Sequence, residues 1–290
     1  MMFSIVFTLT MICATFVLLS CEKPIALEDG ETDDVEGNLR VNVYEIEKAP
    51  FANLTRAAVS DVCTRLNFAI YDEGGSRLKQ VNQTSDKSGF GQCAFQLEEG
   101  TYQLVVVGHS ANGNPTMTNL GKIHFTNSTG YTDTFLCYGE VNIGEEPVEL
   151  NISMDRIVAL CRFVVTDDIP AEVKKLQFYY TGGSGAFNAA TGMGCVNSKQ
   201  TVTYDVATVS EKQFDLYTFL HEPSDNIVLT VTALDASGNE LHSRQFDVPM
   251  QQNHITWLSG AFFDGSGSSS TSITGVTVNT NWDGETHLTF

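Results

Sequence analysis

From residue 39 onward the sequence is built of short apolar runs separated by turn residues, with no helical period of any length. In residues 66–71, Leu, Phe and Ile alternate with Asn, Ala and Tyr, and the run ends at an Asp-Glu-Gly-Gly turn. A period of two places successive side chains on opposite faces of a strand. No segment of a dozen residues has apolar residues at every third or fourth position. The chain is therefore predicted to be all-β.

The β pattern runs twice along the chain. The first series ends near a Glu-Glu-Pro turn at residues 145–147, and the second opens with a nearly continuous apolar run at residues 157–165. Such a run is typical of a strand that is buried on both faces. We therefore predict two tandem β-sandwich domains, at residues 39–147 and 148–290, each long enough to bury a core of its own.

Three turns are predicted to join neighbouring strands as hairpins. Two of them, at residues 72–75 and 234–240, are rich in Asp, Gly, Ser and Asn, which favour tight reversals. The third is Glu-Glu-Gly at residues 98–100, between the β-type runs 95–97 and 102–107. Each of these turns is expected to keep its two flanking strands side by side.

The first twenty residues have the features of an export signal. Residues 3–19 carry no charge, and Leu-Leu-Ser at residues 18–20 comes directly before Cys21. The apolar stretch has the length of a secretory signal and is short for a membrane span. The end resembles the lipobox of bacterial lipoproteins, in which residues 1–20 are removed and Cys21 receives the acyl chains that bind the membrane. An uncleaved N-terminal anchor is the alternative, and in either case the rest of the chain is exported.

Acidic residues dominate the segment after Cys21 and the chain as a whole. Residues 21–38 are predicted to form a lipidated, solvated tether, and an address for surface export is the second interpretation of the same acidic run. In the whole chain 35 Asp and Glu stand against 16 Lys and Arg, which gives a formal net charge of −19. Such a charge repels phosphate backbones, so a nucleic-acid partner is not expected.

Five cysteines remain after the signal and Cys21, at positions that no metal motif explains. An odd number allows at most two disulfides and leaves one thiol over, whereas buried free cysteines in strands are an equal alternative. No pair has C-x-x-C spacing, and no cysteine lies near histidine at zinc spacing. The candidate disulfide residues are Cys63, Cys93, Cys137, Cys161 and Cys195.

No catalytic motif occurs in the sequence. There is no nucleophile elbow, H-E-x-x-H helix, Walker loop or dinucleotide fingerprint, and the six histidines are scattered singly. The Gly-Gly-Ser-Gly stretch at residues 182–185 lacks the Lys and helix of a phosphate loop. Oxygen ligands at residues 235–240 have nearly the spacing of an EF-hand, but the remaining ligands are missing, so we interpret them as a turn. The chain is predicted not to be an enzyme and to bind no cofactor or metal.

Four segments carry a resemblance to a known family: CTRLNFAIYD at residues 63–72, LEEGTYQLVVVG at 97–108, LNISMDRIVA at 150–159 and WLSGAFF at 257–263. They resemble the FimB/Mfa2 fimbrial subunit family of Bacteroides-type bacteria. The resemblance covers nearly all of the mature chain in order. It implies two transthyretin-like Greek-key β-sandwiches in a lipoprotein of the outer membrane, exposed at the cell surface. Its implied role is structural, as an anchor or minor subunit of a surface fimbria that supports cell adhesion.

The resemblance also implies how the protein meets its partners. Subunits of that family assemble by β-strand addition, in which a strand from one subunit completes the sheet of another. Stalk subunits lose their first strand to an Arg-specific protease. In this chain residues 39–44 are the candidate first strand, and a cut after Arg56 would make Ala57 the new N-terminus; a plain surface arginine is the alternative. The expected partners are other fimbrial subunits, the outer membrane through the lipid on Cys21, and host or bacterial surface ligands.

A surface glycan-binding lipoprotein of a polysaccharide-uptake system is the alternative function. It would also be a β-sandwich on an acidic tether, and it would present aromatic rings on which sugars stack. The two tryptophans are Trp257 and Trp282, both in regions predicted to be strands. Trp282 follows a Gly/Ser-rich loop at residues 265–271 and a strand expected at residues 275–281.

Overall fold

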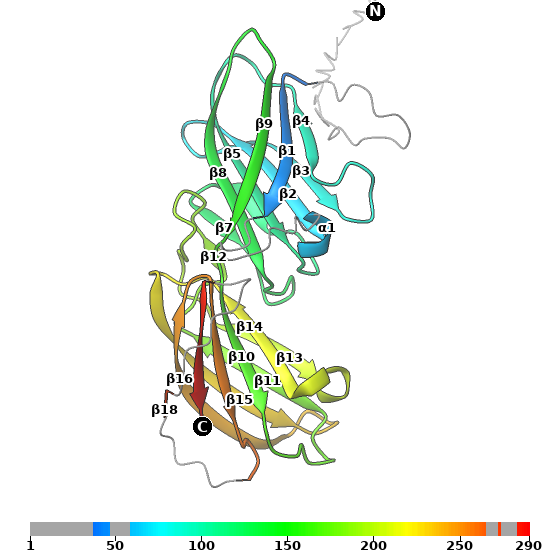
Figure 1. Ribbon diagram of the computed structural model, residues 1–290, viewed down its shortest axis with the longest axis vertical. Coiled ribbons are helices and arrows are strands. Elements are labelled where there is room, and N and C mark those ends of the chain that lie inside the picture. The colour runs from blue at the N-terminus through cyan, green and yellow to red at the C-terminus, as the bar shows by residue number, and fades with distance from the viewer. Residues whose placement is uncertain (1–36, 47–58, 265–271, 274–282) are drawn as a thin grey trace, which may run out of the picture.

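The computed structural model describes residues 37–46, 59–264, 272–273 and 283–290 (Figure 1). Within these residues the only α-helix is the single turn α1 (Val59–Val62), and two 3-10 turns, η1 (Val206–Thr208) and η2 (Ser210–Lys212), are the other helical pieces. No helix of this part of the chain is long and apolar enough to cross a membrane. The prediction of an all-β protein is confirmed. Several predicted features lie outside the described residues: the signal, Cys21, the tether up to residue 36, Arg56, Ala57, the strand at 275–281 and Trp282.

The first sandwich consists of seven strands in two layers. One layer has the order β3-β2-β5-β8 and the other has the order β9-β1-β4, and the layers are joined where β8 meets β9 at Phe135 and Leu136. Apolar residues of both layers, among them Val41, Phe68 and Val106, form one buried cluster between them. The strands are β1 (Leu39–Ile46), β2 (Arg65–Tyr71), β3 (Arg77–Thr84), β4 (Gln92–Phe95), β5 (Gly100–His109), β8 (Thr134–Ile143) and β9 (Val148–Arg156).

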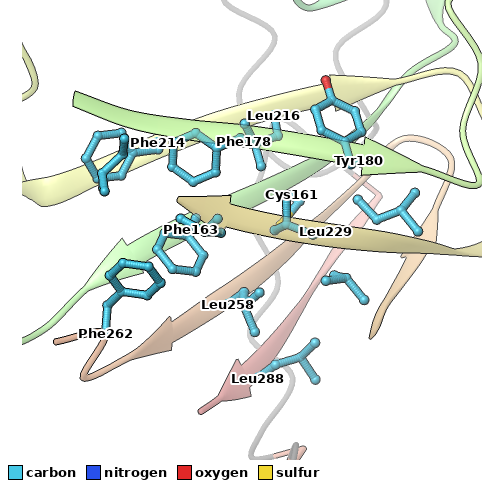
Figure 2. Close-up of a cluster of buried hydrophobic side chains, with 14 of the residues drawn as sticks. Cys161, Phe163, Phe178, Tyr180, Phe214, Leu216, Leu229, Leu258, Phe262 and Leu288 are labelled. Atoms are coloured by element: carbon cyan, nitrogen blue, oxygen red, sulfur yellow. The ribbon is translucent and has the colours of Figure 1, made fainter. Parts of the chain in front are cut away.

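The second sandwich has a four-stranded layer, β13-β11-β15-β16, and a five-stranded layer, β14-β10-β17-β19-β18. Its core is rich in aromatic rings: Phe163 contacts Phe178 and Phe262 edge to face, and all three are fully buried (Figure 2). The strands are β10 (Ala159–Val165), β11 (Lys175–Thr181), β13 (Gln200–Asp205), β14 (Gln213–Thr218), β15 (Ser224–Leu234), β16 (Glu240–Gln251), β17 (His254–Gly260), β18 (Ser272–Ile273) and β19 (Gly284–Thr289).

The two sandwiches share one strand topology. In each, the first, fourth and last of seven strands form one layer, and the second, third, fifth and sixth form the other. The first and last strands run parallel in both, as β1 with β9 and as β10 with β17. Two strands of the second sandwich, β18 and β19, have no counterpart in the first. β19 pairs in parallel with the outer edge of β17, and no strand of the described residues holds the matching place beside β9.

The strand β9 lies on the N-terminal side of the junction between the sandwiches. It pairs with β1 along residues 148–154 and with β8 at its end, so its hydrogen bonds belong to the first sandwich. The sequence-based boundary, at residues 145–147, instead placed this strand in the second domain. The Glu-Glu-Pro turn carries the chain from β8 in one layer to β9 in the other, and turn chemistry alone does not distinguish such a crossing from a domain boundary.

A small third sheet and a shared apolar cluster connect the sandwiches. β12 (Ala186–Phe187), from the second half of the chain, pairs with β7 (Lys122–His124), which in turn pairs with β6 (Thr116–Asn119). Around them Phe125, Phe187 and Phe219 pack with residues from both sandwiches in a continuous buried cluster. The joint therefore combines main-chain hydrogen bonds with apolar packing.

Two of the three predicted hairpins are confirmed. β2–β3 and β15–β16 close on turns in which Gly75 and Gly238 adopt positive φ, and in each turn an aspartate, Asp72 or Asp235, accepts backbone N–H groups. The third prediction is wrong. β4 pairs with β1 and β5 pairs with β2 and β8, so the turn at residues 98–100 carries the chain from one layer to the other.

Candidate functional site

The first strand, β1, is seated in the interior of its sheet. It pairs antiparallel with β4 from Leu39 to Asn42, and parallel with β9 over nearly its whole length. The alternation seen in the sequence is realised in its burial, because Leu39 and Val41 have no exposed surface and Val43 and Ile46 keep at most 8% of theirs. β1 therefore supplies both ladder hydrogen bonds and a row of core side chains to the first sandwich.

Polar contacts fix where β1 begins. The side-chain amide of Asn38 donates to the carbonyl of Leu97 (2.8 Å) and accepts from the N–H of Leu97 (2.9 Å), while its backbone carbonyl accepts from the N–H of Val148 (2.8 Å). Asn38 thus links the chain that follows β4 to the start of β9. Gly37 lies so close to Phe95 that a Cβ would be 2.7 Å from the Phe95 carbonyl oxygen. These contacts set the register of the strand.

β1 is held in place by main-chain hydrogen bonds on both of its edges and by its alternate buried side chains. The residues predicted to govern its release, Arg56 and Ala57, lie outside the described residues, as does the predicted lipidation residue Cys21.

Trp257, the candidate sugar platform, has both of its faces covered. It lies on β17 in a cross-strand row with Asp215, Arg162 and His287. The Arg162 guanidinium lies 4.9 Å from the Trp257 ring centre, and the His287 ring stacks on it at 5.4 Å, nearly parallel. The indole N–H donates to Glu285 at 3.1 Å. A sugar ring would have to displace one of these partners, so Trp257 is better described as a packing residue of the sheet.

The five mature-chain cysteines are free thiols on separate elements, so the structure contains none of the disulfides that the sequence left open. Burial raises the pKa of Cys63, Cys93 and Cys161 to about 12, so these three are neutral small apolar residues at physiological pH. Cys137 is half-buried on β8, and Cys195 is exposed in the loop after β12. Cys63, Cys93, Cys137 and Cys161 therefore act as packing residues.

A buried polar network occupies one end of the first sandwich. His109, which is fully buried, donates from Nε2 to the Asn67 side-chain oxygen (2.7 Å), and its Nδ1 accepts from the N–H of Ala111 (3.1 Å). Asn67 in turn donates to Asn82 and Asn114. Burial, together with the positive charge of Arg65, lowers the pKa of His109 to about 4. The imidazole is therefore neutral at neutral pH and holds strands β2, β3 and β5 in place.

The glycine-rich loop at residues 182–185 is a packing feature. A Cβ on Gly183 would lie 2.0 Å from the Thr218 hydroxyl, and Gly182 has a φ of 93°. Ser184 is buried, and its hydroxyl bonds to the backbone of Ala186 and not to a base. The described part of the chain also brings together no group of three His, Cys, Asp or Glu residues suited to a metal ion.

The open outer edge of β9 was missed by the sequence reasoning. Among the described residues no strand pairs with this edge between Val148 and Met154. One signal in the sequence points to it: from Cys137 to Asp155 the chain has five acidic residues and no Lys or Arg. Acidic side chains along a strand are a common way to keep an unpaired edge from aggregating.

Together these features define an all-β protein of two tandem sandwiches with one topology, joined by a packed junction. The chain belongs to the family of unknown function DUF6562, whose sequence profile matches residues 31–289. No match was found among curated protein sequences.

Solved structures similar to this chain include proteins of fimbriae. The fimbrial anchor protein Mfa2 from Porphyromonas gingivalis is 16% identical with a TM-score of 0.40, over 71% of this chain and 80% of its own. A fimbrial assembly protein from Parabacteroides distasonis is 16% identical with a TM-score of 0.39, over 81% and 94%. A candidate cell adhesion protein from Bacteroides ovatus is 14% identical with a TM-score of 0.48, over 79% and 94%. Fimbrial proteins of the kind that the sequence resembles are thus among its structural neighbours.

Proposed function

We propose that the protein is a structural subunit of a surface fimbria, an anchor or minor subunit held on the outer membrane by lipid on Cys21. The observation that carries the proposal is the position of β1 in the interior of its sheet, between β4 and β9. This strand is the first of the described elements, it completes a sheet from its interior, and residues 47–58 separate it from the next described element, which begins at Val59. The likeness in sequence at residues 63–72, 97–108, 150–159 and 257–263 supports the same role.

Two processing states follow from this proposal. In an anchor, Cys21 keeps its lipid and β1 stays in the first sandwich, so the sandwich is complete and does not accept a strand in that place. In a polymerising subunit, a cut after Arg56 releases β1 and exposes the surfaces that Leu39 and Val41 cover. A strand from a neighbouring subunit then replaces it. We favour the anchor state, because the resemblance in sequence implies an anchor or minor subunit and because Cys21 stands at a lipobox-like end.

The N-terminus of the native protein distinguishes the two states. Mass spectrometry of the envelope fraction is expected to find Cys21 as the N-terminal residue, with acyl chains attached. A start at Ala57 would move the protein to a polymerising role, and an intact Met1 would contradict the lipoprotein assignment.

The fimbrial role itself is tested in a deletion strain. Loss of an anchor is expected to release fibres into the medium or change their length, and restoring the gene is expected to reverse the change. A chain with Cys21→Ser is the matched variant, because it alters only the lipidated position. Normal fibre number, length and attachment in the deletion strain would contradict the proposal.

A further inference from the structure

The two sandwiches differ at one equivalent position, the outer edge of the last strand. In the second sandwich β19 covers the edge of β17 in parallel, from His254 opposite Gly284 to Ser259 opposite Thr289. Beneath this cover the inward residues Thr256 and Leu258 are at most 2% exposed. The same topology in the first sandwich leaves the edge of β9 without a strand among the described residues.

The side chains of β9 have the alternating apolar and polar pattern of a strand whose outer edge can pair with another strand. Val148, Leu150 and Ile152 alternate with polar residues and pack against the first core, yet each remains partly exposed. Only Met154, close to where β8 joins, is fully buried. The apolar row that β19 seals in one sandwich is therefore partly open to solvent in the other.

The corner between the two layers repeats the contrast. In the second sandwich Phe290, just past β19, stacks on Phe163 at 5.1 Å and lies 4.6 Å from the ring of Phe246 on β16, so it fills the space between the layers. In the first sandwich the strand that corresponds to β16 is β8, where Gly139 shares the inward side with Val141. A Cβ on Gly139 would meet no atom within 4 Å.

Some main-chain N–H groups of β9 point toward its outer edge, where no strand of the described residues pairs with them. The N–H of Val148 donates to Asn38 on the β1 side, and successive N–H groups of a strand point to opposite edges. The N–H groups of Glu149 and Asn151 therefore point away from β1. In the second sandwich the corresponding groups of β17 serve the parallel ladder with β19.

Charge decides the kind of strand that fits. From Cys137 to Asp155 the chain carries Glu140, Glu145, Glu146, Glu149 and Asp155 and no basic residue. The next residue, Arg156 at the end of β9, is nearly buried and pairs with Asp133. A second copy of the chain, with a net charge of −19, is repelled by this edge, and its own β19 is already paired with β17. A strand with Lys or Arg at alternate positions would place a charge beside Glu149 and its apolar residues over Leu150 and Ile152.

We infer that the outer edge of β9 is a docking site for an extended, basic-and-apolar alternating segment of a different protein, which adds to the sheet in parallel. The site goes beyond the proposed function, because β1 stays in place and no proteolysis is needed. It is open in the anchor state and would give that state a partner of its own. Its failure would leave the fimbrial role standing, since the two have separate readouts.

The experiment uses the mature full chain and a synthetic nine-residue peptide in which lysine alternates with isoleucine and leucine. A peptide of the same composition with its lysines in one block is the control for general attraction to an acidic surface. Binding is followed by fluorescence anisotropy, and hydrogen exchange read by NMR locates the protected amides. The alternating peptide is expected to protect Glu149 and Asn151 and to leave the protection of β1 unchanged.

Two variant pairs make the site specific. Asn151→Pro removes one outward N–H and places a ring at the edge, so binding is expected to weaken about tenfold or more, whereas Asn151→Ala keeps the N–H and is expected to bind within about twofold. Both variants lose the hydrogen bond that the Asn151 side chain accepts from Asn42 on β1, so the difference between them reports the edge itself. Glu149→Lys is expected to weaken binding several-fold and to reduce its salt dependence, and the distant Glu240→Lys is not. The Glu149 pair keeps the test valid if the proline variant folds poorly.

Several results would overturn the inference. Equal binding of the alternating and block peptides, or protection of amides elsewhere on the acidic surface, would reduce it to general charge attraction. Protection of the Glu149 and Asn151 amides before any peptide is added would mean that this chain already covers the edge. No measurable binding, or unchanged binding by Asn151→Pro and Glu149→Lys, would remove the site altogether.

Discussion

The two sandwiches of this chain reach the same topology with different kinds of core. The second is closed by its own C-terminal end: β19 pairs with β17, and Phe290 stacks on Phe163 within a cluster of aromatic rings. The first is closed at its centre by β1, whose contributions are mainly aliphatic, and its outer strand β9 has an open edge. One topology is therefore compatible with a finished sheet and with a sheet that can still accept a strand.

The two sandwiches differ in where the closing strand, β19 or β1, stands along the chain relative to its partner strands. β19 comes after all seven strands of its sandwich, so the chain can add it at an edge without disturbing the rest. β1 comes before its six partners and sits between β4 and β9, so its removal would divide a layer. Loss of an edge strand exposes one row of side chains, whereas loss of an interior strand exposes two ladders as well.

The largest expected change in the free energy of unfolding comes from truncating a buried side chain on the first strand of each sandwich. Phe163→Ala in β10 removes a ring that contacts four other phenylalanines and is expected to cost about 3–5 kcal/mol of unfolding free energy. Leu39→Ala in β1, at a site with no exposed surface, is expected to cost about 2–5 kcal/mol. Denaturant unfolding with the exposed Thr203→Ala as control measures both.

These two variants also test whether the sandwiches unfold together. The junction cluster around Phe125, Phe187 and Phe219 joins them, so both variants are expected to shift a single transition. Two separate transitions, each shifted by only one of the variants, would show that the sandwiches are energetically independent and would contradict the coupling expected from the junction.

Much of the fold could be predicted because burial imprints a period on the sequence. The run at residues 157–165 was expected to be buried on both faces, and in β10 Phe163 faces the second core while Leu160 faces the junction cluster. Likewise β1 covers the predicted first strand, residues 39–44. In both cases one local pattern reports which faces are covered.

The pairing of strands could not be predicted in the same way. β4 and β5 flank a tight turn, yet they join different layers, because a turn fixes a reversal and not the sheet to which the next strand belongs. β1 and β9 are neighbours although more than a hundred residues separate them along the chain. The open edge of β9 follows only from the pairing of all the strands, so the acidic run from Cys137 to Asp155 does not by itself show which strand edge it lines.

The next expected effect is a pH dependence of the stability of the first sandwich, which comes from the buried His109. Burial, and then the charge of Arg65, lowers its pKa from 6.5 to about 4, so the unfolded chain binds a proton more readily than the folded one. This contribution to stability is complete above pH 6.5 and is lost as the pH falls through that value toward 4. The loss is expected to reach about 3 kcal/mol.

His109→Gln provides the comparison for this pH effect. The amide cannot titrate and can still donate to Asn67, so the variant is expected to be less stable than the parent at pH 7 but to lose less stability between pH 6.5 and 4.5. Urea unfolding at several pH values measures both slopes. The same slope in parent and variant would show that other groups cause the acid sensitivity.

The smallest expected effect separates two arginine–aspartate pairs of similar geometry. Arg156 meets Asp133 in a two-pronged contact with nitrogen–oxygen distances of 2.7 and 2.9 Å, and Arg162 meets Asp215 at 2.6 and 2.7 Å. Their burial differs, because the Arg156 side chain is 6% exposed and that of Arg162 is 25% exposed. Arg156 also donates to Asn253 of the second sandwich, so it lies at the junction, whereas Arg162 lies on a sheet face.

Removing one carboxylate should therefore have unequal costs. Asp133→Asn takes one charged partner away from a nearly buried guanidinium and is expected to cost about 2 kcal/mol. This is below the full cost of breaking a buried pair, because Asp133 itself is 26% exposed and water replaces part of the interaction. Asp215→Asn leaves Arg162 with solvent and the Trp257 ring, and is expected to cost at most about 1 kcal/mol. Urea unfolding in low and high salt measures both, and only the Asp215 cost should shrink with salt. Equal costs would mean that the junction around Arg156 relaxes to admit water, and the two sandwiches would then be joined less firmly than their packing indicates.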